Sequence, residues 1–345
     1  MPVSVQAFGR TREGKPASLY TITNANGMSA VVSDYGAILV RLLVPCPDGV
    51  TRDLVLGYDT LEEYERGGFF GATVGRNANR IAGAAFTLDG VEYPLSDNDS
   101  GCNLHTDFKV GFHKQLWNAE LLPDGVRFSR LSPDGEGGFP GNLQIAVSYT
   151  LLPDNSLVLR YEGVSDRKTL INLTNHSFFH LAGHDAGSVE DEVLTLFADR
   201  FVEIGPGKLP TGRILPVSGT PLDFRRPKRI GQDIDRDWEQ LRLGWGYDHC
   251  YCLDTTPGTP SLAARVEEPR TGLILEMLTD QPGVQFYTAN ALKPQLGKGG
   301  AAYGRRCALC LEAGLYPDGI HHPTFPQPVF AAGEPYRAVT VYRFR

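Results

Sequence analysis

Residues 145–161, IAVSYTLLPDNSLVLRY, contain two apolar runs with a short turn between them. From Ile145 to Leu151 every second residue is large and apolar, which is the pattern of a strand that buries one face. Pro153-Asp154-Asn155 consists of turn-forming residues, and Leu157 to Tyr161 has the composition of a second strand. The segment therefore predicts a β-hairpin, and with it an antiparallel sheet.

The same pattern of strands and turns continues on both sides of this segment. Asp-Gly pairs suit the positive φ angles of tight hairpin turns, and they recur along the chain. They stand at residues 48–49, 89–90, 124–125, 134–135 and 318–319. Strand-like runs lie at residues 87–94, 273–279, 284–292 and 339–344. These positions predict several further hairpins.

Helical signals are few. Thr60 and Glu63 form a capping-box pattern ahead of a short helix, and residues 230–243 have the pattern of another. The 39 glycines and 24 prolines disfavour a mostly helical fold. We expect an all-β fold, a large antiparallel β-sandwich with few short helices. No repeat or linker-like segment divides residues 1–345, which predicts a single domain; a boundary near residues 150–170 is the alternative.

Charge and composition disfavour several classes of partner. The chain has 33 basic and 40 acidic residues, a formal net charge of −7, and its basic residues are scattered. We therefore expect neither nucleic acid nor an acidic membrane as a partner. No stretch reaches the roughly 18 apolar residues of a membrane span. The first residues have no apolar core of signal-peptide type, so we expect a cytoplasmic protein whose six cysteines stay reduced.

Two cysteine pairs have a spacing that zinc ligands also show. They are Cys250-x-Cys252 and Cys307-x-x-Cys310. Both pairs lie in strand-like runs, where a three-residue offset would point Cys307 and Cys310 to opposite faces. We interpret the four cysteines as small apolar core residues and predict no metal site there.

Three histidines are spaced by four residues. On a helix, His176, His180 and His184 would stack and suggest a metal. The residues around them are rich in β-branched, aromatic and turn-forming types, which do not favour that helix. One functional histidine with two incidental ones is the favoured interpretation.

Polar residues suited to a polyhydroxylated ligand occur at several places, whereas the P-loop, dinucleotide-binding, serine-hydrolase and zinc-protease motifs are absent. Asn77, Asn79 and Arg80 offer many hydrogen-bond donors between two apolar runs. Asp248 follows two aromatic residues, and a carboxylate with aromatic rings can bind the hydroxyl groups and the faces of a sugar. Glu312 lies in an apolar, strand-like run, where an ionised carboxylate is costly unless it is hydrogen-bonded or serves as a base.

In chain order these fragments resemble the aldose 1-epimerase family, also called galactose mutarotases. The motifs that carry the resemblance are Gly75-Arg-Asn-Ala-Asn-Arg-Ile81, Asn103-Leu-His105, Thr174-Asn-His176-Ser, Gly246-Tyr-Asp248-His, Gln281-Pro-Gly-Val-Gln285 and Cys310-Leu-Glu312. Six dispersed motifs in the family's order are far more specific than any one of them. The resemblance implies a large antiparallel β-sandwich with one open sugar site, and an enzyme that interconverts the α and β anomers of free aldoses.

The resemblance also implies roles for individual residues. Glu312 is the expected base that takes the proton of the C1 hydroxyl, and His176 is the expected acid that protonates the ring oxygen. A glutamate with a histidine can accept and donate a proton near neutral pH. The residues expected to hold the sugar hydroxyls are Asn79, Arg80, His105, Asp248 and Gln285. No metal or organic cofactor is implied, and the expected partner is a monosaccharide such as galactose or glucose, bound by a monomer or homodimer.

The chain departs from the family pattern at a few positions. Thr106-Asp107 stand where two glycines are usual, Phe178 where tyrosine is common, and Ala313-Gly314 where Thr-Gln is usual. Gly314 is two residues beyond Glu312 and shares its strand face. We therefore expect open space beside the base and weaker discrimination between galactose and glucose.

Two other functions stay open. A sugar-phosphate epimerase of the same fold should show several basic residues that converge on the phosphate, and only Arg80 is an obvious candidate. A non-catalytic sugar-binding protein should have lost the base or the acid, and this chain has both.

Overall fold

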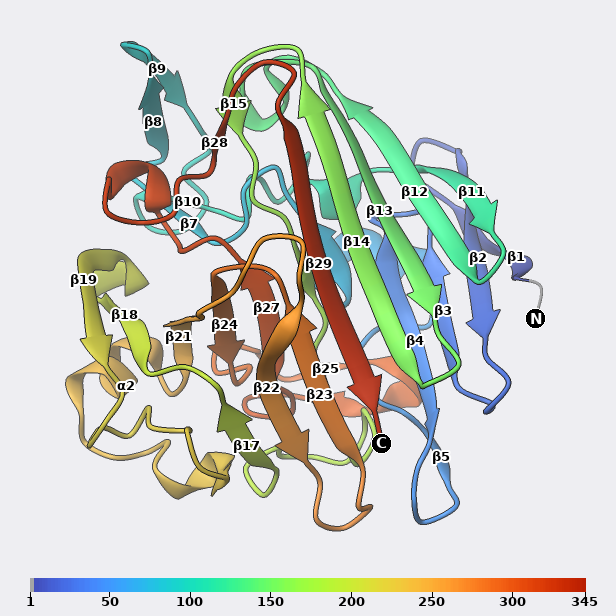
Figure 1. Ribbon diagram of the computed structural model, residues 1–345. Coiled ribbons are helices and arrows are strands. Elements are labelled where there is room, and N and C mark those ends of the chain that lie inside the picture. Colours follow the sequence, from blue (N-terminus) through green and yellow to red (C-terminus); the bar gives the residue numbers. More distant parts are fainter. Residues whose placement is uncertain (1–2) are drawn as a thin grey trace.

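An antiparallel sheet of nine strands forms the front layer of the molecule in Figure 1. The structure is a computed structural model that describes residues 3–345. Across the sheet the strands are β11 (Asn118–Leu122), β12 (Gly125–Ser132), β13 (Leu143–Leu151), β14 (Ser156–Ser165), β29 (Pro335–Phe344), β23 (Ile274–Thr279), β22 (Ser261–Glu267), β17 (Val193–Leu196) and β20 (Lys228–Arg229). The predicted hairpin is the pair β13 and β14, in which Val147 faces Tyr161. Along β13 the large apolar residues are buried, whereas Ser148 and Thr150 are partly exposed, as their alternation predicts.

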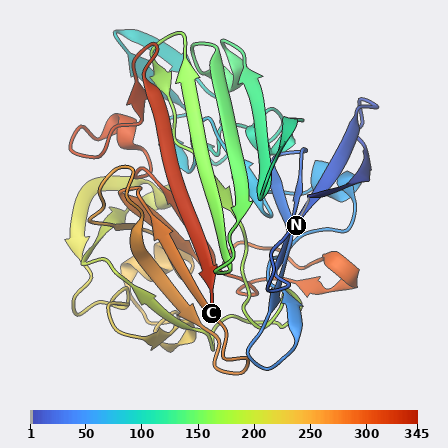
Figure 2. The ribbon, with the colours of Figure 1, turned by 45° about the vertical axis from the view of Figure 1, so that its right-hand side comes forward.

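Two five-stranded sheets lie behind this layer (Figures 1 and 2). One consists of β1 (Ser4–Arg10), β2 (Pro16–Thr23), β3 (Ser29–Ser33), β4 (Ile38–Pro45) and β5 (Thr51–Asp53). The other runs β19 (Pro210–Pro216), β18 (Arg200–Ile204), β21 (Asp248–Cys252), β24 (Gly283–Tyr287) and β27 (Cys310–Gly314). One apolar core joins the three sheets, with Val32 from the first, Leu159 from the nine-stranded sheet and Phe286 from the third. The expected all-β sandwich is confirmed.

The remaining strands form short pairs. They are β6 (Ala72–Val74) with β16 (Thr174–His176), β7 (Arg80–Ala82) with β10 (Cys102–Leu104), β8 (Ala85–Leu88) with β9 (Val91–Pro94), β15 (Thr169–Leu170) with β28 (Val329–Phe330), and β25 (Gln295–Leu296) with β26 (Ala302–Tyr303). Two of these pairs, β6 with β16 and β7 with β10, carry predicted site residues.

Within residues 3–345 the α-helices are short, as expected: α1 (Leu61–Arg66) and α2 (Glu239–Gly244). The capping box of Thr60 and Glu63 is present at the start of α1. The helix predicted over residues 230–243 was wrong in extent, because residues 230–232 form only a 3₁₀ turn and α2 begins at Glu239. Aspartates at positions 233, 235 and 237 explain the interruption, since aspartate favours turns over helix interiors. The remaining 3₁₀ turns are η1 (Phe112–Lys114), η2 (Glu136–Gly138), η3 (Pro206–Lys208), η4 (Ile230–Gln232), η5 (Lys298–Gly300) and η6 (Gly319–His321).

The Asp-Gly pairs form more than one kind of turn. Asp89 and Gly90 both have positive φ, 49° and 79°, and close the β8–β9 hairpin as predicted. Asp318 also has positive φ but opens η6, and its carboxylate accepts a hydrogen bond from the Ala82 backbone. That tertiary contact makes residues 318–319 a junction and not a hairpin. The strand expected over residues 284–292 ends at Tyr287.

The C-terminal strand connects early and late parts of the chain. β29 pairs with β14 on one side and with β23 on the other. The nine-stranded sheet therefore holds β11 and β12, which precede residues 150–170, together with β22, β23 and β29, which follow them. Within residues 3–345, the helices all lack the length and apolar character that a membrane crossing requires.

Candidate active site

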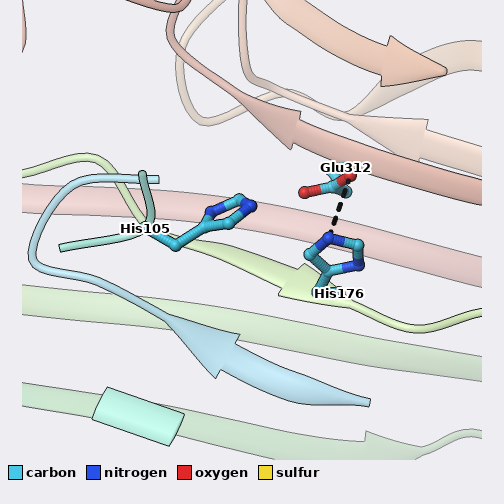
Figure 3. Close-up of side chains that lie close together, drawn as sticks. All are labelled: His105, His176 and Glu312. Atoms are coloured by element: carbon cyan, nitrogen blue, oxygen red, sulfur yellow. Dashed lines mark ion pairs between the residues drawn. The ribbon is translucent and has the colours of Figure 1, made fainter. Parts of the chain in front are cut away.

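Three side chains from distant parts of the sequence meet in Figure 3. His176 ends β16, Glu312 lies in β27, and His105 follows β10. The imidazole Nε2 of His176 lies 3.7 Å from Glu312 Oε1. The rings of His105 and His176 have centroids 5.3 Å apart. The predicted acid and base are therefore neighbours, within one small movement of a hydrogen bond.

Burial acts on this pair in opposite directions. Each of the two side chains keeps only 7% of its surface exposed. Burial and the nearby Asp248 raise the pKa of Glu312 well above its ordinary value. Burial lowers the pKa of His176 to about 4, although the charge of Asp248 opposes this shift. Burial therefore favours one proton for the two groups, with Glu312 protonated and His176 neutral.

Two phenylalanines hold the His176 ring between them. Phe178 stacks on it with a centroid distance of 4.8 Å and an interplanar angle of 9°. Phe69 stacks with a centroid distance of 5.7 Å and an angle of 11°. These faces fix the plane of the imidazole and leave its edge for Glu312. Sequence reasoning missed Phe69, because an aromatic residue in an apolar run carries no distinguishing signal.

Hydrogen bonds of a buried arginine anchor the segment that carries Asn79 and Arg80. Arg76 is fully buried, and its guanidinium donates to Ser132 Oγ at 2.8 Å and to the Pro140 carbonyl at 2.9 Å. The Asn79 backbone N–H donates to Nδ1 of His105 at 3.1 Å. Because Nδ1 accepts this hydrogen bond, the proton of a neutral His105 lies on Nε2. The Nε2–H group is then a hydrogen-bond donor for a ligand.

The neighbouring strands β21 and β24 present Asp248 and Gln285. Gln285 Nε2 donates to Asp248 Oδ1 at 2.7 Å, and Lys208 Nζ donates to Asp248 Oδ2 at 2.9 Å. Burial opposes ionisation, but the charges of Lys208 and Arg80 hold the pKa of Asp248 below its ordinary value. Asp248 is thus an ionised acceptor. Arg80 itself pairs with Asp99 at 2.8 Å.

A small cavity of about 20 Å³ lies beside Glu312. Its lining consists of Ala78, Asn79, Asn172, Thr174, Cys250, Gly283, Gln285, Glu312, Ala313, Gly314, Leu315 and Pro317. Asn79, Gln285 and Glu312 line it directly. Asp248, His105 and His176 are linked to these residues by the contacts described above, and the Arg80 backbone N–H donates to Oδ1 of Asn79 at 2.8 Å. The structure thus brings together all seven predicted residues.

The other histidines have separate surroundings. His180 is fully buried beside Glu192, with Nδ1 3.1 Å from Glu192 Oε1. His184 bonds to Tyr303 at 2.8 Å. Residues 176–184 are not helical, so the three rings do not stack. The interpretation of one site histidine with two others elsewhere agrees with this placement.

The cysteine pairs also lie apart. Cys250 and Cys252 belong to one apolar cluster, and Cys307 and Cys310 belong to another. All four are free thiols in the interior. The expectation that Cys307 and Cys310 lie on opposite faces of one strand was wrong, because β27 begins only at Cys310.

Among residues 3–345, two groups of side chains have the composition of a metal site. One ligand atom each from His105, His176 and Glu312 lies within 4.8 Å of the others, and the same holds for His180, Glu192 and Glu268. In the second group both Glu268 oxygens already accept hydrogen bonds from Arg270. The first group consists of the predicted acid and base and their neighbouring histidine.

Residues 18–343 match the family described as Aldose 1-epimerase. The chain belongs to this family.

Named relatives of the epimerase family cover nearly the whole chain. Galactose mutarotase of Bos taurus is 41% identical over 91% of this chain and 90% of its own length. Aldose 1-epimerase of Escherichia coli K12 is 35% identical over 96% of each chain. Among solved structures, an aldose epimerase homologue from C. elegans has a TM-score of 0.88 at 31% identity, over 95% of this chain and 99% of its own. Galactose 1-epimerase from Lactobacillus acidophilus has a TM-score of 0.86 at 26% identity, over 99% and 98%.

One departure from the epimerase pattern has a different consequence from the one expected. Gly314 lines the cavity on the same face as Glu312, but the space beside it is not empty. A Cβ atom at position 314 would lie 2.9 Å from Oδ1 of Asn172. That oxygen accepts a hydrogen bond from the Leu315 backbone at 2.9 Å. Asn172, which sequence reasoning did not single out, therefore fills the position beside the base.

The substitution of the two usual glycines has a local structural role. Thr106 has a positive φ of 73° and its Oγ1 accepts from the Asn77 backbone at 3.0 Å. The Asp107 carboxylate accepts from the backbone of Val110 at 2.9 Å. Both side chains thus stabilise the loop that carries His105.

Proposed function

We propose that this epimerase interconverts the α and β anomers of free aldoses such as galactose and glucose, with Glu312 as base and His176 as acid. The observation that carries the assignment of roles is the 3.7 Å approach of His176 Nε2 to Glu312 Oε1 inside a buried pocket. A sugar that spans these two groups offers its C1 hydroxyl to one and its ring oxygen to the other.

The reaction is two proton transfers and one bond cleavage. Glu312 accepts the proton of the C1 hydroxyl while His176 gives a proton to the ring oxygen. The electron pair of the bond between C1 and the ring oxygen leaves with that oxygen, and C1 becomes an aldehyde. Rotation about C1–C2 exposes the other aldehyde face, and the reverse transfers close the ring as the other anomer. The acid and the base each typically accelerate such a reaction by about 10²–10⁴-fold.

The resting proton count suits this cycle. The pair holds one proton, which burial favours on Glu312. The reactive arrangement places the same proton on His176 and leaves Glu312 ionised, so only a shift between two neighbouring groups is needed. The pair ends each turnover with the proton count it began with.

Five further residues hold the sugar in this proposal: Asn79, Arg80, His105, Asp248 and Gln285. They combine an anionic acceptor, a guanidinium and neutral donors, which match hydroxyl groups. The cations Arg80 and Lys208 are already paired with Asp99 and Asp248. That pairing favours a neutral sugar over a sugar phosphate, which needs unpaired positive charge.

We further propose a cytoplasmic enzyme, monomeric or homodimeric, that uses no cofactor and has neither nucleic acid nor a membrane as a partner. The six thiols are free and buried, which suits a reducing compartment. Every proton transfer is assigned to a side chain of this chain. Activity should therefore survive dialysis against a chelator, and a loss restored by zinc would contradict this part.

Polarimetry of freshly dissolved α-D-galactose and α-D-glucose tests the function. The wild-type protein should speed the approach to equilibrium rotation, and methyl α-D-galactoside should bind without turnover, because its C1 oxygen carries no proton to remove. Turnover of the glycoside would exclude a reaction that starts at the C1 hydroxyl. Sugar binding without any acceleration would support the non-catalytic alternative.

A further inference from the structure

A lysine outside the predicted set contacts the carboxylate that is proposed to hold the sugar. Lys208 is the last residue of η3, the turn between β18 and β19. Its Nζ lies 2.9 Å from Asp248 Oδ2, and each of the two side chains keeps 11% of its surface exposed. Lys208 thus lies at the same wall of the site as Asp248, on a turn between strands of the sheet that carries Glu312 (Figure 1).

Two unusual backbone conformations bring Lys208 and Trp245 to this wall. Lys208 has a φ of 60°, and Trp245, at the end of α2, has a φ of 61°. Residues with a Cβ rarely adopt this left-handed region, and such positions cluster at functional sites. The Lys208 ammonium lies 4.5 Å from the centre of the Trp245 ring, over its face. The attraction of the cation to the indole holds the lysine in place.

The hydrogen-bonding capacity of Lys208 is not exhausted. An ammonium group has three N–H donors. For residues 3–345, Asp248 is the acceptor that the structure gives to Lys208 Nζ. At least one donor therefore remains for a ligand. Beside it, Asp248 is an ionised acceptor whose other oxygen is held by Gln285. A donor next to an acceptor matches a sugar hydroxyl, which accepts with its oxygen and donates with its proton.

We propose that Lys208 is a specificity-determining residue of the sugar site: it donates a hydrogen bond to the oxygen of a sugar hydroxyl whose proton Asp248 accepts. Trp245 is its positioning residue and acts through the ammonium. The inference rests on the proposed function, since it takes the sugar to extend from Glu312 toward Asp248.

The test compares Lys208→Met with wild type on galactose and on its 2-, 3-, 4- and 6-deoxy analogues by polarimetry. Loss of a charged hydrogen bond should lower kcat/KM for galactose by about ten- to a hundredfold, mainly through KM. For one deoxygalactose this penalty should disappear, because the hydroxyl that Lys208 contacts is missing. Lys293→Met is the matched control, since Lys293 is exposed and takes no part in the site; it should leave kcat/KM unchanged.

Two results would overturn the inference. One is an unchanged kcat/KM for galactose in Lys208→Met. The other is an equal penalty for galactose and every deoxy analogue, which would mean that Lys208 acts only by orienting Asp248. For the positioning part, Trp245→Leu should weaken binding in the wild type and add nothing to Lys208→Met. Additive losses would show that Trp245 acts independently of the lysine.

A binding measurement separates failure of this inference from failure of the proposed function. Galactose and the deoxy analogues are titrated calorimetrically into wild type and Lys208→Met. If wild type turns over no aldose but binds galactose, the function fails while the Kd values still test the lysine contact. If wild type is active and Lys208→Met lowers kcat/KM equally for galactose and every deoxy analogue, only the inference fails.

Discussion

His176 and Glu312 combine three physical features at the scale of single residues: a short separation, nearly complete burial, and opposite responses to that burial. A carboxylic acid loses its tendency to ionise in a dry site, and an imidazole loses its tendency to protonate. One proton shared by the pair is the result. Phe69 and Phe178 stack on the imidazole, which keeps water from the ring and fixes its plane.

Glu312→Gln should lower kcat for galactose by about two orders of magnitude or more, because the amide keeps the shape but accepts no proton. The Kd for galactose should change little. Polarimetry gives kcat, and calorimetry gives the Kd. Near wild-type turnover would remove Glu312 from the mechanism.

His176→Asn provides the companion measurement. It should reduce kcat to a similar degree, and the double variant should lose less than the product of the two single losses, since the two groups act as a unit. If the loss of kcat in the double variant equals the product of the two single losses, the two groups do not act as a coupled acid–base pair.

The pH dependence follows from the proton count of the pair. With Glu312 protonated, His176 takes up a second proton only around its lowered pKa of about 4. Below that pH neither group accepts a proton, so kcat/KM should fall as the solution becomes more acidic. The upper limit is set by the raised pKa of Glu312. A decline that begins near the ordinary histidine value of 6.5 would show that His176 titrates like an exposed imidazole.

At the scale of elements, β27 and the segment before β16 share the space beside the base. Gly314 pairs with Gly283 across β24 and β27, and Asn172 lies where a side chain at position 314 would begin. Asn172 is tied to Leu315 by its side-chain oxygen. The absence of a side chain at 314 therefore accommodates a neighbouring segment more than it widens the sugar pocket.

Gly314→Gln should accordingly destabilise the protein by about 1–3 kcal/mol, the usual effect of overpacking, and should leave the ratio of kcat/KM for galactose and glucose unsharpened. Chemical denaturation measures the free energy of unfolding. Gly304→Gln is the control, because a Cβ at Gly304 has no neighbour within 4 Å. A stable Gly314→Gln protein with sharper preference between the sugars would restore the expectation made from the sequence alone.

At the scale of the whole molecule, we propose that residues 1–345 fold as one domain. The nine-stranded sheet contains β11 and β12 from before residues 150–170 and β22, β23 and β29 from after them, and β29 pairs directly with β14. A chain that divided there would have to break this sheet. The sugar site has the same character, since its residues come from positions as distant as Asn79 and Glu312.

One domain should unfold in one transition. Trp117 lies before residues 150–170 and Trp238 after them, so variants that keep only one of these tryptophans report on each part. Fluorescence and far-UV circular dichroism should give the same denaturation midpoint within each variant. If Trp117 fluorescence changes at a different midpoint from the circular dichroism, the chain contains two independently unfolding units.

Much of the fold and of the site could be predicted from local sequence. Alternation from Ile145 to Leu151 determined a half-buried strand, and Asp89-Gly90 determined a tight turn, because both features depend on residues adjacent in the chain. The capping box at Thr60 is local in the same way. The motifs around His176 and Glu312 predicted the acid and the base, because their order along the chain resembles a known family.

Tertiary structure alone decided the features that depend on distant contacts. The shared proton of His176 and Glu312 follows from burial and from a 3.7 Å approach between two strands far apart in sequence. Asn172 occupies the space at Gly314, and Lys208 meets Asp248 through a left-handed turn. A strand pattern specifies which face a side chain points to but not what another strand places opposite it. Which residue lies opposite is set by the packing of the whole sandwich, and no short stretch of sequence contains that information.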